Sequence, residues 1–244
     1  MDFDPGFLFL LLLVAFLYAS VGHGGASGYL ALMALYGFAP EMMKPTALLL
    51  NIFVASSAFI SYYRGGYFSW KLFWPFALAA VPAAYFGGML STSVVLYKQL
   101  LGAFLLVAAL RFVLPFERFS IAKRPVNPYA ALLIGAGIGL FSGMIGIGGG
   151  IILSPLLILL GWADMKQAAA VSALFILVNS VSGLLGQLQT GINFSPDMLL
   201  YVGVAFLGGL GGAYSGAFKF NQTTLKICLV LVLFIASIKL LLTA

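Results

Sequence analysis

Charged side chains are scarce in this sequence. Only 7% of its 244 residues are Asp, Glu, Lys or Arg, whereas soluble domains carry about 25%. Hydrophobic residues make up 63% of the chain, and the mean hydropathy is +1.12. Several stretches of about 18 residues or more carry no charge, which is the length a helix needs to cross a hydrocarbon core of about 30 Å. The composition therefore excludes a soluble globular protein and predicts an all-α, polytopic integral membrane protein.

Acidic residues and metal-ligating residues are especially few. The six carboxylates all fall in or near predicted loops: Asp2, Asp4, Glu41, Glu117, Asp164 and Asp197. No paired carboxylates sit in a predicted span, and one histidine and one cysteine cannot complete a metal cluster. We therefore expect no enzyme activity, no cofactor and no metal. A proton relay through intramembrane carboxylates is not expected either.

Cysteine pairs and nucleic-acid-binding patches are also missing. The single cysteine, Cys228, excludes an internal disulfide and is interpreted as a packing residue. The net charge of +6 comes without a basic stretch interleaved with aromatic residues, so we expect no nucleic-acid partner. Asp2 and Asp4 stand where a secretory signal would be basic, and the apolar start of the chain is therefore interpreted as retained structure.

Glycine, by contrast, is abundant, and two clusters of it interrupt apolar stretches. They are Gly22-His23-Gly24-Gly25-Ala26, called break one below, and Gly146-Ile147-Gly148-Gly149-Gly150, called break two. Glycine costs about 1 kcal/mol per residue in a helix interior, so each cluster predicts an opening of the helical backbone. At membrane depth such an opening is tolerated only where it is buried in protein or lines a watery cavity. We therefore expect the function to lie at the two breaks.

Each break is predicted to separate two short apolar pieces, and three longer spans follow. In the first half the pieces are 7–21 and 27–36, and the spans are 46–63, 72–90 and 99–114. In the second half the pieces are 130–145 and 151–160, and the spans are 166–188, 198–217 and 225–242. The polar stretch 115–128 is expected to be a cytoplasmic linker between a first repeat, 1–114, and a second repeat, 129–244.

The two halves repeat one pattern. Gly37-Phe38-Ala39 corresponds to Gly161-Trp162-Ala163, Thr46-Ala47-Leu48 to Ser172-Ala173-Leu174, and Gly87-Gly88 to Gly211-Gly212. Such self-similarity indicates an internal duplication. The short pieces form either a re-entrant hairpin or a pair of short crossings, and in both cases they return the chain to its starting side. With three full spans the number of crossings per half is therefore odd, so the halves are predicted to form an inverted-topology repeat.

The basic residues predict the orientation in the membrane. With the N-terminus outside, nine of them fall at inside ends: Arg64, Lys71, Arg111, Arg118, Lys123, Arg124, Lys166, Lys219 and Lys226. Three fall at outside ends: Lys44, Lys98 and Lys239. Because basic residues prefer the cytoplasmic side, both termini are predicted to lie outside.

These motifs resemble the sulfite exporter TauE/SafE family of bacterial membrane transporters. The resemblance covers nearly the whole chain and rests on the two breaks, the Asn-containing helix after each break, and the later Gly-Gly pairs. Its most specific part is break two followed by Ser154-Pro155, whereas the first copy has His23, Ala26 and Ala31 instead. The resemblance implies a bacterial inner-membrane protein that transports sulfite or short organosulfonates.

The predicted substrate site combines the breaks with polar residues close to them in the sequence. Helix N-termini carry a partial positive charge that suits an anion, and two such termini, at 27–36 and 151–160, can converge from opposite repeats. The candidate residues are Gly22, His23, Gly24, Gly25, Ser27, Asn51, Gly146, Gly148, Gly149, Gly150 and Asn179.

Two of the side-chain roles stay open at the level of sequence. His23 either satisfies local backbone as a neutral imidazole or donates to substrate and carries protons. Asn51 and Asn179 either bond a neighbouring helix or face the site.

Alternatives of function and assembly are open as well. The chain could be a permease for another small organic anion, or a membrane accessory subunit whose glycines serve packing alone. The expected partners are a small anion and membrane lipid. The sequence does not specify the oligomeric state, and a homodimer is one of the open alternatives.

Overall fold

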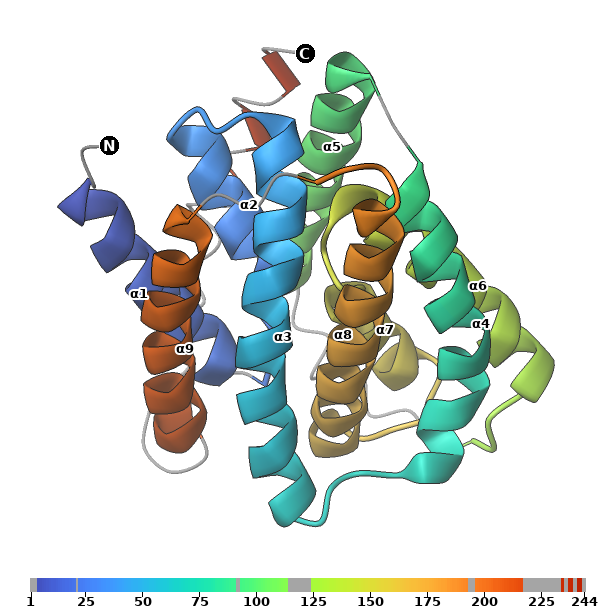
Figure 1. Ribbon diagram of the computed structural model, residues 1–244. Helices are drawn as coiled ribbons and strands as arrows, with labels where there is room; N and C mark the ends of the chain where they lie inside the picture. The colour runs from blue at the N-terminus through green and yellow to red at the C-terminus, as the bar shows by residue number, and fades with distance from the viewer. Residues whose placement is uncertain are drawn as a thin grey trace.

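The computed structural model describes residues 4–20, 22–90, 93–113, 124–192 and 196–216, with five further positions: 234, 237, 238, 241 and 242 (Figure 1). Within these residues the secondary structure is helical and contains no strand. Cys228, nearly all of the predicted last span and most of the predicted linker lie outside the described residues.

Nine helices are described, and both breaks lie between helices. The first five are α1 (Pro5–Ser20), α2 (Ala26–Leu35), α3 (Pro40–Arg64), α4 (Trp70–Met89) and α5 (Val94–Val113). The next four are α6 (Pro128–Ile145), α7 (Gly150–Leu159), α8 (Met165–Leu188) and α9 (Asp197–Gly216). Break one separates α1 from α2, and break two separates α6 from α7, as the glycine clusters predict.

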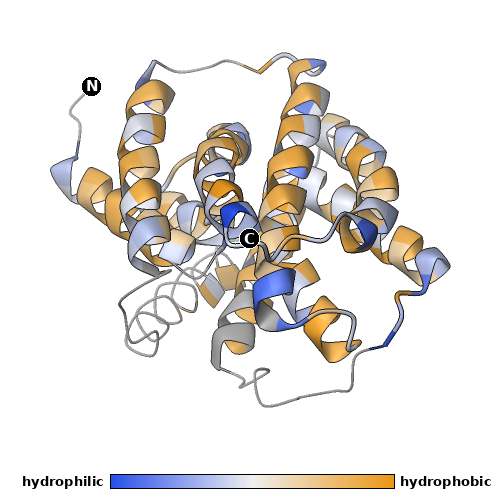
Figure 2. Cartoon of the chain, turned by 90° about the horizontal axis from the view of Figure 1, so that it is seen from below, coloured by the Kyte–Doolittle hydropathy of each residue, from blue (hydrophilic) through white to orange (hydrophobic). Residues whose placement is uncertain are grey.

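Five of the described helices, α3, α4, α6, α8 and α9, are long and apolar enough to cross a membrane. α2 and α7 have 10 residues each and α1 has 16, whereas α6 has 18 and is longer than the short piece predicted there. Large apolar side chains face outward, among them Leu133 at 76% exposure and Leu199 at 75%. Strongly hydrophilic residues are concentrated in loops and at helix ends (Figure 2). The molecule is a multi-pass helical membrane protein.

The start of α3 differs from the sequence prediction. The helix begins at Pro40, six residues before the predicted span 46–63, so Glu41 and Lys44 lie in its first turns. Proline fits the first helical position because its fixed φ suits a helix and its missing N–H would be unpaired there anyway. Pro45 is accommodated inside the helix, as are Pro75 and Pro82 in α4.

Helices α1, α3 and α4, which precede residue 115, pack mainly against helices that follow it. α3 and α8 lie side by side and run in opposite directions (Figure 1). α4 packs mainly against α6 and α8, and α9 packs mainly against α1 and α3. The helices of the two parts are therefore interleaved.

Glycines allow these helices to approach closely. On α6, Gly135, Gly139 and Gly143 recur every four residues, and a Cβ on each would collide with a backbone carbonyl of α4, at Phe76, Ala80 and Ala84 respectively. On α9, Gly208 and Gly212 lie in the same way against carbonyls of Leu12 and Phe16 in α1. These glycines have the packing role typical of small residues in membranes. Gly137, in contrast, faces open space.

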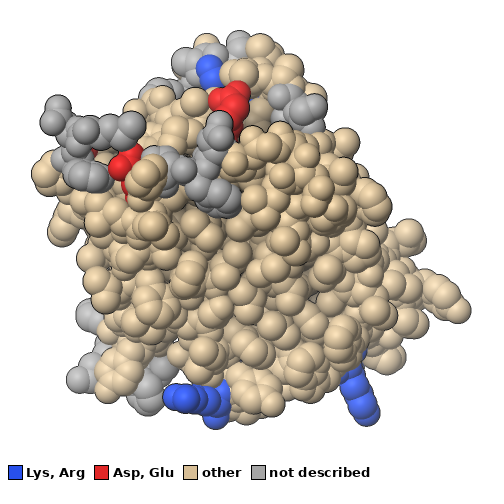
Figure 3. Space-filling model, viewed as in Figure 1, with Lys and Arg blue, Asp and Glu red and all other residues tan. Residues whose placement is uncertain are grey.

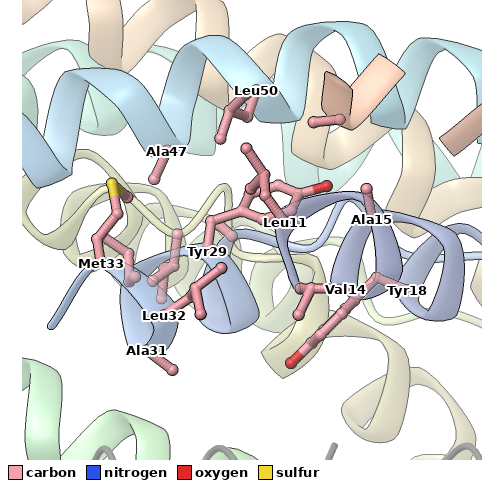
Figure 4. Packing of buried hydrophobic residues seen from close by; sticks show 14 of the residues in the cluster. Leu11, Val14, Ala15, Tyr18, Tyr29, Ala31, Leu32, Met33, Ala47 and Leu50 are labelled. Atoms are coloured by element: carbon pink, nitrogen blue, oxygen red, sulfur yellow. The ribbon is translucent and has the colours of Figure 1, made fainter. Parts of the chain in front are cut away.

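The short helix α2 is held by apolar packing on both sides. Its residues Tyr29, Leu32 and Met33 lie against α1 and against Ala47 and Leu50 of α3 (Figure 4). All five side chains are buried. A helix of 10 residues is too short to be stable by itself, so this burial is what holds α2 in place. It thereby also fixes where the chain turns back after break one.

Charges are distributed unequally between the two ends of the molecule. Arg64 ends α3, and Lys71 and Lys166 begin α4 and α8, all at the lower end in Figure 1. Asp4, Glu41 and Asp197 lie where α1, α3 and α9 begin, at the upper end. Figure 3 shows acidic side chains above and basic side chains mainly below, although a basic side chain also lies above, beside an acidic one.

Candidate functional site

Both breaks are built on left-handed backbone. The φ angles are +77° and +96° at Gly22 and Gly25, and +92°, +73° and +80° at Gly146, Gly148 and Gly149. Residues other than glycine rarely adopt such φ angles, and a right-handed helix cannot continue through them. This explains why each helix opens at these glycines. All residues of 22–26 and 146–150 are buried.

A helix N-terminus emerges from each break without a capping side chain. Gly25 and Gly149 are the N-cap residues of α2 and α7, and neither makes a side-chain cap. The first bond of α2 runs from Tyr29 N to Gly25 O, and in α7 Ile152 N and Leu153 N donate to Gly149 O. The preceding N–H groups have no partner within their own helix and give each terminus a partial positive charge.

The two breaks meet at the side chain of Asn51. A Cβ placed on Gly24 would lie 2.7 Å from Asn51 Oδ1, and a Cβ placed on Gly148 would lie 2.7 Å from Asn51 Nδ2. Each of these positions would also lie 2.8 Å from Ile176 Cγ2 on α8. The amide of Asn51 therefore lies between the two breaks, which are 124 residues apart in the sequence.

The Asn51 amide is only partly satisfied. Its Nδ2 donates to Ser180 Oγ at 3.3 Å, whereas Oδ1 has no hydrogen-bond partner and the residue is 0% exposed. Leaving a buried acceptor unpaired costs about 1–3 kcal/mol. Asn51 thus bonds a neighbouring helix, which is one of the two roles considered for it, and its unpaired oxygen lies beside Gly24 of break one.

Two other unpaired polar groups lie at the breaks. The hydroxyl of Tyr29 would be 2.6 Å from a Cβ on Gly25, and Cβ of Ser142 would be 3.5 Å from a Cβ on Gly149. Both hydroxyls are buried and have no partner. A buried polar group without a partner calls for an explanation, such as a ligand or an ordered water.

His23 reaches from break one to the helix that follows break two. Its Nε2 lies 3.3 Å from Ser154 Oγ on α7, and that hydroxyl donates to Ser172 Oγ on α8 at 2.8 Å. Its backbone N–H donates to Tyr18 O. The imidazole is 5% exposed and therefore lies inside the protein.

The remaining predicted residues are placed differently. Ser27 bonds the Tyr18 hydroxyl at 2.8 Å, so it is tied back to α1. Asn179 is fully buried with both amide atoms unpaired, but it is not among the atoms that border the break glycines. Gly150 packs against Ile176. Gly22 and Gly146 border α3 at two separate places, Tyr62 and Lys44.

The structure adds Ile176, Ser172 and Ser180 of α8 to the site, none of which was predicted. They recur every four residues and so share one face of the helix. The match of Ser172 to Thr46 in the repeated pattern was the available signal. Within the described residues, no group of three or more His, Cys, Asp or Glu side chains could hold a metal ion.

Long apolar helices, a hydrophobic outer surface and buried helix breaks define the class of polytopic membrane transporters. The chain matches the family model of the sulfite exporter TauE/SafE over residues 7–240 and belongs to that family. It is a membrane transporter of this family.

Proteins similar to the chain carry the name of probable membrane transporters. The chain is 36% identical over 243 residues to the probable membrane transporter protein y4hK of Sinorhizobium fredii, covering 97% of both chains. It is 26% identical over 230 residues to the probable membrane transporter protein YdhB of Bacillus subtilis, covering 91% of this chain and 92% of that protein. The probable membrane transporter protein MamO of Magnetospirillum gryphiswaldense is 26% identical over 198 residues, 66% of this chain and 31% of MamO. No solved structure matches the chain significantly.

Proposed function

We propose that the protein moves a small sulfur-containing anion, sulfite or a short organosulfonate, through a site between the two breaks. The observation that carries the proposal is the position of Asn51, whose amide borders Gly24 of break one and Gly148 of break two. One substrate molecule at this amide would contact both breaks. Asn179 is a further candidate contact, because its buried amide is unpaired on the same helix as Ser180.

The chemistry of the site favours an anion. Two uncapped helix N-termini, α2 and α7, start at the breaks, and the unpaired hydroxyls of Tyr29 and Ser142, which can donate, lie next to them. The described carboxylates, Asp4, Glu41, Asp164 and Asp197, all lie at or near helix ends. Backbone N–H donors and helix N-termini stabilise negative charge, whereas a cation site would require acidic or carbonyl ligands. The sulfur chemistry of the substrate is inferred from the family description.

The mechanism we propose is alternating access between two inverted repeats, 1–114 and 129–244, joined by a cytoplasmic linker at 115–128. The reciprocal packing of α4 on α6 and of α9 on α1, together with antiparallel α3 and α8, supports this arrangement. Inverted repeats expose a midplane site to each side in turn when one repeat moves against the other.

We further propose that the protein lies in the bacterial inner membrane with both termini outside. Arg64, Lys71 and Lys166 share the lower end in Figure 1, which is therefore the cytoplasmic end under the positive-inside rule. Asp4, Glu41 and Asp197 are at the opposite end. This orientation places the loop between α8 and α9 outside.

Gly24→Ala tests the site without straining the backbone, because φ at Gly24 is not positive. The added methyl would occupy the space beside Asn51 Oδ1 and Ile176 Cγ2. We expect sulfite flux into proteoliposomes to fall about ten-fold or more, as in other cases in which a small misplacement disturbs a binding geometry. Gly137→Ala, which meets nothing within 4 Å, is the matched control and should keep native flux.

The same assay separates the alternatives. Flux of a small carboxylate without flux of sulfite or sulfonate would favour the permease for another organic anion. Flux of a cation with no response to sulfur oxyanions would contradict the proposed function. No flux of any solute, with Gly24→Ala and the native protein equally stable, would favour an accessory subunit.

A further inference from the structure

One face of α3 borders both breaks along most of the length of the helix. A Cβ on Gly146 would lie 3.0 Å from Lys44 O, Gly24 and Gly148 border Asn51, and a Cβ on Gly22 would lie 2.7 Å from the Tyr62 ring. Lys44 and Tyr62 are five helical turns apart, so they share a face and are separated by roughly 27 Å along the axis. Break two therefore leads from Lys44 to Asn51.

The register between α3 and α8 places Lys44 opposite Gln187. Asn51 bonds Ser180, and Leu48 Cδ1 would lie 3.4 Å from a Cβ on Gly183. From the first pair to the second, the residue number falls by three on α3 and rises by three on α8, as antiparallel helices require. One further turn on each helix pairs Lys44 with Gln187.

Contacts of Gly88 in α4 bring the same two residues together. Lys44 Nζ donates to Gly88 O at 3.3 Å, and a Cβ on Gly88 would lie 3.2 Å from the backbone nitrogen of Gln187. Lys44 and Gln187 therefore both adjoin Gly88, at the end of the molecule that we assign to the outside.

Lys44 and Gln187 both carry N–H donors, and not all of these donors have an acceptor. Gln187 is 3% exposed, and its Nε2 is buried without a partner. Lys44 is partly buried, and within the described part of the chain no carboxylate lies within ion-pairing distance of its ammonium. An ammonium has three donors, and the single bond to Gly88 O leaves two of them for other acceptors.

We propose that Lys44 and Gln187 form an outer anion site, which the transported oxyanion occupies between the outside solution and Asn51. The inference rests on the proposed function for its substrate and direction. Lys44 supplies the charge that attracts the anion, and Gln187 Nε2 supplies a buried donor that the anion satisfies. From this site the substrate reaches Asn51 along break two.

A purely structural role for Lys44 is the competing explanation. Gly88 lies near the C-terminus of α4, and a lysine that bonds a terminal carbonyl stabilises a helix end. The test must therefore separate the attraction of an anion from the stabilisation of α4.

The first measurement is sulfite uptake by proteoliposomes of phosphatidylcholine alone, which excludes an anionic lipid headgroup as the ligand. Lys44→Met keeps the apolar stem and removes the charge, and Lys98→Met removes a charge from the same end of the molecule as a control. We expect Lys44→Met to raise the outside sulfite concentration for half-maximal uptake about ten-fold, equivalent to about 1.4 kcal/mol. Lys98→Met should match the native protein.

The second measurement restores the charge chemically. Lys44→Cys in a Cys228→Ser background should show the same weakened uptake, and 2-bromoethylamine, which alkylates the thiol to a positively charged thioether that sulfite does not cleave, should recover it. Iodoacetamide, which adds a neutral group, should not. The outer site would be overturned if both reagents restored thermal stability and uptake did not depend on the added charge. Lys44 would then serve only to stabilise the C-terminus of α4.

The third measurement does not depend on transport. Sulfite should protect Lys44, but not Lys98, from acetylation in the native protein, as read by mass spectrometry. Protection without sulfite flux would refute the proposed function and leave the outer site standing. Sulfite flux with no protection and an unchanged half-saturation in Lys44→Met would refute the outer site alone.

Discussion

At the scale of the residue, the burial of Asn51 costs stability, and the proposed function would account for that cost. Its amide is buried between the two breaks, and its Oδ1 has no partner. An apolar side chain of similar size would avoid the cost of burying that oxygen. A residue retained at such a cost is best explained by what it binds.

We therefore expect Asn51→Leu to keep or raise the thermal stability of the protein while sulfite flux falls about ten-fold or more. Thermal unfolding in detergent and flux in liposomes measure the two effects separately. Leu48→Met, one turn away on the same helix, is a control that should change neither by much, because volume-conserving apolar exchanges cost less than about 1.5 kcal/mol. Native flux in Asn51→Leu would remove this residue from the substrate site.

His23 provides a prediction about pH. If the imidazole carries protons or donates to substrate, His23→Ala should reduce flux and flatten its dependence on pH between about 5.5 and 8. This range brackets the ordinary pKa of an imidazole, about 6.5. Ser154→Ala, which removes the hydroxyl that Nε2 contacts, should shift the same profile. An unchanged profile in both variants would restrict His23 to the bonding of its local surroundings.

At the scale of the element, glycine serves two different purposes in this chain. Those of the breaks open the helices with left-handed backbone, whereas Gly135, Gly139 and Gly143 stay helical and admit α4. The clustering of the first group and the four-residue spacing of the second distinguish them in the sequence.

Substitutions along α6 should separate close packing from free surface. Gly139→Ala places a methyl against the Ala80 carbonyl and should destabilise the protein by about 1–3 kcal/mol through overpacking. Gly137→Ala faces open space and should be neutral or stabilise by up to about 1 kcal/mol. Denaturation of the purified variants measures the difference, and equal stabilities would contradict the described α4–α6 contact.

Most helix positions could be predicted, because apolar length and glycine clusters are local signals. The predicted span 46–63 began six residues too late, because Pro40 can begin a helix and Pro45 is accommodated within it. The proximity of Asn51 to both breaks could not be derived, because it depends on the register of α3 against α8. For the same reason, Ile176 and Ser180 were not recognised.

At the scale of the whole molecule, the charges of the two ends determine how it lies in the membrane. We expect cysteines placed singly at Ser69, before α4, and at Gln189, after α8, in a Cys228→Ser background, to be labelled from opposite sides. Gln189 should react with an impermeant reagent added outside, because it lies at the end opposite to Arg64 and Lys71. Labelling of Ser69 from outside would reverse the orientation, and labelling of both from one side would contradict the fold.

The interleaving of helices has a consequence for how the protein is made. α4 finds its principal partner in α6, and α1 finds its partner in α9, so neither helix can complete its packing until the second half of the chain has been synthesised. During that interval lipid must cover the carbonyl-lined face of α4 that later receives Gly135, Gly139 and Gly143. Assembly is therefore a late, post-insertion event in which the second half displaces lipid from the first, and the two breaks reach their common neighbours Asn51 and Ile176 only when α8 is in place.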